Sequence, residues 1–186
     1  MTNSSTIRIK ELEFLRLHKN IALPLFELCR NFQKTLIQIK RGKKNAKLVR
    51  ELFVTKKVNF DYVLVSSSKR TKKTLQILLK KLKKPKKIFS SKKLYLTDEK
   101  KIIEFIKKVP KTYNSILLIN HEPVITNLVR ELIKNHNGNL FKLLNYKFST
   151  SAFAKINFKI KDWSEVLNKG LLKEFVRPKD IQVSKE

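Results

Sequence analysis

The order of strand-like and helix-like segments is the feature that most constrains the fold of this chain. Segment 60–67, FDYVLVSS, is rich in aromatic and β-branched residues and predicts a buried strand. Segment 69–84 repeats Leu and Ile at helical spacing against a lysine face and predicts an amphipathic helix. The alternation then continues along the chain: helix 97–109, strand 115–120, a helix after Pro123, and strands 150–160 and 171–176.

This alternation predicts an α/β protein with three layers, α/β/α, in which helices cover both faces of a mainly parallel sheet. A chain of 186 residues suffices for one such domain, spanning 1–186. We expect helix 97–109 to begin at an N-cap Thr97 and the helix after Pro123 to end before Gly138.

Cysteine content and hydropathy indicate the compartment. The single Cys29 excludes an internal disulfide framework and a cysteine-rich zinc site. The N-terminal residues MTNSSTIRIKELEF lack the apolar core of a signal peptide, and the aliphatic run 116–119 is too short to span a membrane. We therefore expect a soluble, cytoplasmic protein without a membrane partner. The sequence leaves the oligomeric state open.

The formal net charge of +28 calls for an explanation, because nucleic-acid-binding proteins have such charges. The cations are mostly lysines in short runs along the whole chain, such as 80–87 and 44–47, without interleaved aromatic residues that would stack on bases. We therefore do not expect nucleic acid as a specific ligand. Weak, salt-sensitive attraction to any polyanion follows from the charge alone.

Polar residues follow the predicted strands at the positions where α/β proteins bind ligands. Ligands of a parallel sheet bind beyond the carboxyl ends of its strands. Arg16 ends the segment LEFLR (12–16) and His18 follows two residues later, Arg70 follows strand 60–67, and His121 follows strand 115–120. Guanidinium groups bind phosphate oxygens in a planar fork, and a neutral imidazole can attack phosphorus. Their convergence predicts a phosphoryl-transfer site.

Each of these residues has a simpler alternative when taken alone. Arg70 fits a cation at a helix start, His121 a capping residue, and His18 a surface-loop residue. His136, in KNHNG, fits a helix end and receives no role. We predict no metal site, because no carboxylate cluster accompanies the histidines.

Four segments resemble the histidine phosphatase superfamily, and within it the SixA-type phosphohistidine phosphatases. They are FDYVLVSSSKRTKKTL (60–75), SILLINHEPVITNLVREL (115–132), FSTSAFAKINF (148–158) and GLLKEFVRPKDI (170–181). The resemblance is continuous over about residues 40–181. It implies a phosphoglycerate-mutase-like fold and a phosphatase that works without a cofactor. The implied substrate is a signalling or phosphotransfer protein that carries phosphohistidine.

The resemblance also implies roles for individual residues. It makes His18 the nucleophile of a covalent phosphohistidine intermediate, and places Arg16 and Arg70 on the phosphate. His121 becomes the second catalytic histidine, which stabilises the transferring group. Glu122 is the candidate proton donor for the leaving group.

The chain departs from the family where the first strand ends, because the family has Arg and His adjacent and Leu17 interrupts them here. Aligning Arg16 places Leu17 on the nucleophile, whereas aligning His18 requires a one-residue insertion. A β-bulge at Leu17 would absorb that residue and direct His18 into the site. The alternative is a catalytically impaired protein that binds phosphohistidine or polyanions.

A second departure suggests a cause for the first. The family has Arg-Pro-Leu and then Lys-Arg-Gly before its first helix, and this chain keeps only Lys-Arg-Gly at 40–42. Residues 31–35, NFQKT, can be encoded as AAT TTT CAA AAG ACC, and these bases read one position later give Ile-Phe-Lys-Arg-Pro. We therefore hypothesise a compensated frameshift over roughly residues 17–39.

Overall fold

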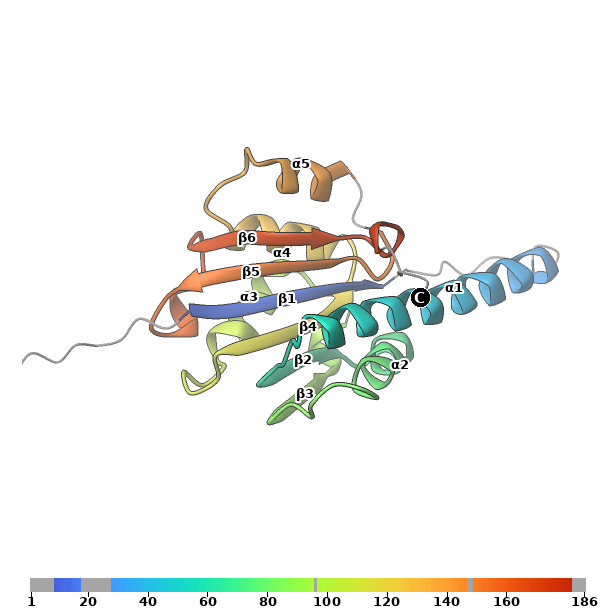
Figure 1. The fold of residues 1–186 in the computed structure, drawn as a ribbon, viewed down its shortest axis with the longest axis horizontal. Helices are drawn as coiled ribbons and strands as arrows, with labels where there is room; N and C mark the ends of the chain where they lie inside the picture. The colour runs from blue at the N-terminus through green and yellow to red at the C-terminus, as the bar shows by residue number, and fades with distance from the viewer. Residues whose placement is uncertain (1–8, 18–27, 96, 147–148, 182–186) are drawn as a thin grey trace, which may run out of the picture.

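The computed structural model describes residues 9–17, 28–95, 97–146 and 149–181, which fold around one six-stranded sheet (Figure 1). The strands are β1 (Ile9–Leu17), β2 (Tyr62–Ser66), β3 (Lys87–Ser91), β4 (Ser115–His121), β5 (Phe153–Lys159) and β6 (Gly170–Val176). The α-helices are α1 (Leu28–Thr55), α2 (Lys69–Leu78), α3 (Glu99–Lys107), α4 (Val124–Leu132) and α5 (Asn139–Tyr146). Short 3-10 helices follow β3, β5 and β6: η1 (Lys92–Leu94), η2 (Trp163–Glu165) and η3 (Pro178–Asp180).

The sheet has the order β3-β2-β4-β1-β5-β6 and is mainly parallel. β1, β2, β3 and β4 run in the same direction, whereas β5 is antiparallel to both β1 and β6. Helices α1 and α2 cover one face, and α3 and α4 cover the other (Figure 1). The predicted three-layer α/β/α architecture is therefore confirmed.

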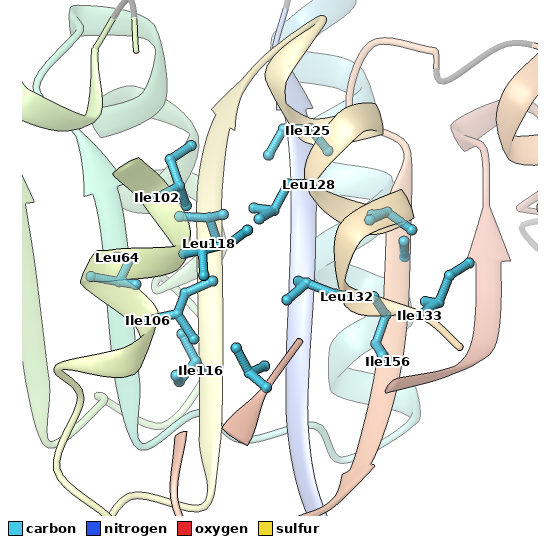
Figure 2. Close-up of a cluster of buried hydrophobic side chains, with 14 of the residues drawn as sticks. Leu64, Ile102, Ile106, Ile116, Leu118, Ile125, Leu128, Leu132, Ile133 and Ile156 are labelled. Carbon is cyan, nitrogen blue, oxygen red and sulfur yellow. The ribbon is translucent and has the colours of Figure 1, made fainter. Parts of the chain in front are cut away.

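Strand β4 shows why a central strand of this sheet has an uninterrupted apolar sequence. Ile116 and Leu118 pack on the α3–α4 face, as Figure 2 shows, and Leu117 and Ile119 pack on the α1–α2 face. All four side chains are fully buried. Alternate residues of a strand point to opposite faces, so a strand covered on both sides needs apolar residues at every position.

Three predicted helix boundaries are wrong. Helix α2 ends at Leu78, not at 84, because the following segment to Pro85 crowds lysines together and gains little burial. Asp98, not Thr97, caps α3, since its Oδ1 accepts the backbone N–H of Lys101 at 2.8 Å. Gly138 does not end α4.

Helix α4 ends at Leu132, because Ile133 takes an extended conformation and forms a β-bridge with Gly170. Gly138 instead precedes α5, which the sequence did not predict. Strand β3 was also missed. It is an edge strand whose burial pattern is mostly exposed, so it lacks the apolar alternation by which strands are found.

Helix α1 differs most from what the family resemblance implies. It runs without interruption from Leu28 to Thr55, so Lys40, Arg41 and Gly42 lie inside it and not before it. Its first half extends past the sheet edge at which β1 ends (Figure 1). No helix in the described ranges combines the length and apolar character needed to cross a membrane.

Candidate active site

The carboxyl ends of β2 and β4 form the edge at which two of the predicted site residues, Arg70 and His121, lie. The two strands pair in parallel, with Val65 opposite Ile119, so both chains leave the sheet at the same edge. Strand β4 ends one residue later than predicted, so His121 is its last residue. Arg70 lies in the first turn of α2. Ligands of α/β proteins bind at this edge.

A hydrogen bond joins the two connections that carry Arg70 and His121. Ser68 Oγ lies 3.1 Å from His121 Nε2. The same hydroxyl caps α2, because it accepts the backbone N–H of Thr71 at 3.2 Å. The start of α2 is therefore fixed against the imidazole of His121, although the residues are 53 positions apart.

Thr71 holds the turn that presents Ser68 and Arg70. Its side chain is fully buried, and its hydroxyl lies 2.7 Å from the carbonyl oxygen of Ser66 and 2.8 Å from that of Ser68. Because a hydroxyl has one proton, it donates to one of these oxygens at a time. The Ser-rich turn after β2 is thus closed by side-chain contacts.

Asn120 fixes the backbone of His121 from the other side. Its Nδ2 donates to the carbonyl oxygen of Leu94 at 2.9 Å, and its Oδ1 accepts the backbone N–H of His121 at 2.9 Å. Asn120 is buried, so both hydrogen bonds are shielded from water. The ring of Tyr95 meets the ring of His121 edge to face, with centroids 5.9 Å apart.

Sequence reasoning missed the contributions of Ser68, Thr71, Asn120 and Tyr95. Polar residues that follow directly on buried strands were visible at Ser66–Arg70 and Asn120–Glu122. Their hydrogen bonds depend on which strands are neighbours, and only the structure supplies that order. Tyr95 gave no signal, because β3 before it was not predicted.

Glu122 lies next to His121 and is half-buried. Its Oε2 accepts a hydrogen bond from Thr126 Oγ1, one helical turn on, at 2.8 Å. The hydroxyl holds the carboxylate against the start of α4. Its role as a proton donor stays a prediction.

The backbone of β1 bears on the interrupted Arg-His pair. β1 and β4 pair in continuous register, with Arg16 opposite Asn120 and Leu17 opposite His121. The pairing shows no bulge as far as Leu17, the last described residue of this strand. His18 lies outside the residues that the structure describes. Position 17 is thus the β1 position in register with His121.

His136 is separate from this arrangement. It is exposed, its Nε2 lies 3.0 Å from the carbonyl oxygen of Arg130, and its ring packs on Phe141. Within the described ranges, no three His, Cys, Asp or Glu side chains are grouped so that they could hold a metal ion.

Comparison with known proteins gives a match in structure but none in sequence. No family model matches the chain, and no curated protein matches it. A solved structure named as a SixA phosphohistidine phosphatase, from Nakamurella multipartitia, superposes with a TM-score of 0.70 at 16% identity, covering 92% of this chain and 97% of that one.

Two further structures agree with this match. The protein histidine phosphatase SixA in complex with tungstate has a TM-score of 0.68 at 20% identity, with coverage of 92% of this chain and 99% of that one. A phosphoglycerate mutase from Plasmodium falciparum has a TM-score of 0.55 at 14% identity and covers 96% of each chain. The chain therefore has the phosphoglycerate-mutase-like fold of the histidine phosphatases, with the SixA proteins among its structural neighbours.

Proposed function

We propose that this protein is a phosphohistidine phosphatase of the SixA type, which removes phosphate from a histidine of a signalling or phosphotransfer protein. The observation that carries the proposal is the contact between Ser68 and His121. It places the start of α2, with Arg70 in its first turn, against a buried histidine at the ligand-binding edge of the sheet.

The chemistry available there suits a tetrahedral oxyanion. The first turn of α2 presents backbone N–H groups and a guanidinium, and both attract phosphate oxygens. The neighbouring SixA structure was determined with tungstate, which is a tetrahedral oxyanion like phosphate. We extend that property to this chain as part of the proposal.

The proposed reaction has two steps. An imidazole nitrogen of His18 attacks phosphorus, and the P–N bond to the substrate histidine breaks as the leaving imidazole takes a proton, with Glu122 as the candidate donor. Water then attacks the phosphorus bound to His18 and gives a proton to the Glu122 carboxylate, and the P–N bond to His18 breaks, which releases orthophosphate and restores the free imidazole. Arg16, Arg70 and His121 bind the phosphoryl oxygens in both steps.

Trapping the covalent intermediate tests this function. The protein is mixed with a labelled phosphohistidine donor, and we expect an acid-labile, alkali-stable phosphoenzyme. Label is lost in His18→Ala and kept in His136→Ala, a matched control whose imidazole lies on the carbonyl of Arg130. Label retained in His18→Ala would contradict the assignment of the nucleophile.

The register of β1 favours a second candidate function, a catalytically impaired protein that still binds phosphohistidine or polyanions. Leu17, and not a histidine, is opposite His121 in the sheet. Loss of a covalent nucleophile removes several orders of magnitude in rate. The trapping experiment together with a tungstate titration separates the two candidates, since an impaired protein binds tungstate but acquires no label.

A further inference from the structure

The stretch of chain that includes Ser68, the residue in contact with His121, has many basic residues and no acidic ones. Residues 62–97 contain twelve Lys and Arg but no Asp or Glu. This stretch forms β2, α2, β3 and η1, which lie together at one end of the sheet (Figure 1). Two of its lysines pair with acids from outside the stretch, Lys81 with Glu51 and Lys86 with Asp61.

Three other lysines of this stretch stand at the site edge without such partners. Lys69 begins α2, directly after the Ser68 that contacts His121, and Lys92 and Lys93 form η1. All three are exposed, and none forms an ion pair with a described residue. Together with Tyr95 they are called the basic rim below.

The basic rim is held in place relative to His121. Leu94, which follows Lys93, is fully buried, and its carbonyl oxygen accepts a hydrogen bond from Asn120. Asn120 also accepts the backbone N–H of His121, and the Tyr95 ring contacts the His121 ring edge to face. The backbone that carries the two η1 lysines is therefore anchored to the residue on which the proposed chemistry depends.

We infer that the basic rim is the docking surface for an acidic protein face around the substrate phosphohistidine. The inference rests on the proposed function and names the partner's chemistry. Exposed ammonium groups contribute little to affinity, but they orient and accelerate the encounter with a surface of opposite charge. A single aromatic ring, Tyr95, is not the series of stacking platforms that single-stranded RNA requires.

The probe for this inference is a synthetic peptide that carries a stable phosphohistidine analogue flanked by glutamates. A second peptide has glutamines in their place. The protein is used as the full chain, with Lys92→Glu/Lys93→Glu as the rim variant. Lys159→Glu/Lys161→Glu is the control, because it makes the same change in net charge with exposed lysines at the opposite edge of the sheet, where β5 ends.

Association rates are measured by stopped flow at low salt and at about 1 M salt, where the screening length falls to about 3 Å. We expect the rim variant to bind the glutamate peptide about tenfold more slowly at low salt and at the normal rate at high salt. We expect the control variant to bind the glutamate peptide at the normal rate. We expect the glutamine peptide to bind the rim variant and the unmodified protein at equal rates.

Equal slowing in the rim and control variants would overturn the inference, and so would equal rates for the two peptides. A short oligouridylate is the nucleic-acid probe. If the rim variant slowed the binding of this probe but not of the peptides, the result would overturn the inference in favour of nucleic acid. Tungstate binding separates this result from the proposed function. A protein that binds tungstate but does not distinguish the peptides refutes the rim alone, whereas one that binds neither tungstate nor peptide refutes both.

Discussion

Ser68 shows how one hydroxyl couples helix formation to the candidate site. It accepts the N–H of Thr71, which is otherwise an unsatisfied donor at the start of α2, and it contacts His121. A residue that serves both purposes ties the stability of the helix to the orientation of the imidazole. The effect on helix stability and the effect on His121 can be separated by comparison with Asp98, which caps α3.

We expect Ser68→Ala to lower the free energy of unfolding by about 1 kcal/mol, because α2 loses its cap. Tungstate affinity should also fall by about two- to tenfold, because His121 loses a hydrogen bond that orients it. Urea unfolding and calorimetric titration measure the two quantities. Asp98→Ala removes the cap of α3 and is the control, with a similar loss of stability but unchanged tungstate affinity. Equal tungstate affinity in both variants would contradict the coupling.

Asp61 gives a prediction for the pH dependence of stability. It precedes β2, at the end of the strand opposite the candidate site. Burial raises the pKa of this carboxyl, but hydrogen bonds from Lys86 and the Asn114 N–H outweigh burial and hold the pKa below its ordinary value. Its stabilising contribution is therefore complete above about pH 4, the pKa in the unfolded chain, and is lost as pH falls through the folded-state pKa. Asp61→Asn should lower stability at pH 7 and flatten its decline in acid, as urea unfolding at a series of pH values would show. An unchanged acid decline would exclude this role.

At the scale of elements, the accuracy of sequence reasoning followed burial. β2 and β4 are covered on both faces and were predicted from their apolar runs, whereas the mostly exposed edge strand β3 was not. The predicted end of α4 was wrong because a tertiary contact sets it. Ile133 continues the helical apolar pattern but leaves the helix to bridge Gly170.

Two glycines give opposite predictions for the same substitution. A Cβ on Gly170 would lie 2.5 Å from Ile156 Cγ2 and 2.7 Å from the carbonyl oxygen of Leu132, so Gly170→Ala should destabilise by about 1–3 kcal/mol. Gly42 lies inside α1 with nothing within 4 Å of an added Cβ, so Gly42→Ala should stabilise by about 0.5–1 kcal/mol. Thermal unfolding of both variants is the measurement. Effects of the same sign would contradict this account.

The frameshift hypothesis concerns the element in which the chain departs most from the histidine phosphatase pattern that its sequence resembles. Lys40, Arg41 and Gly42 lie inside an extended α1, so the segment before them does not follow the family pattern. Resequencing of the gene and transcript should show a base missing and another gained over roughly codons 17–39. A reading frame identical to the present one, shared by related sequences, would reject the hypothesis.

At the scale of the whole molecule, topology places the candidate site. The sequence predicted Arg70 and His121 because each follows a buried strand, and the structure shows that these strands are neighbours in the sheet. It could not predict that Ser68 links them, since a contact across 53 positions depends on strand order. The position of His18 stays a prediction, because it lies outside the described ranges.

The central claim is that Arg70 and His121 bind one oxyanion. A crystal structure of the protein with tungstate tests it most directly. We predict a tungstate at the carboxyl edge of β2 and β4 whose oxygens lie about 3 Å from both the guanidinium of Arg70 and the imidazole of His121. Tungstate absent from this edge, or the two side chains on opposite faces of the sheet, would contradict the claim.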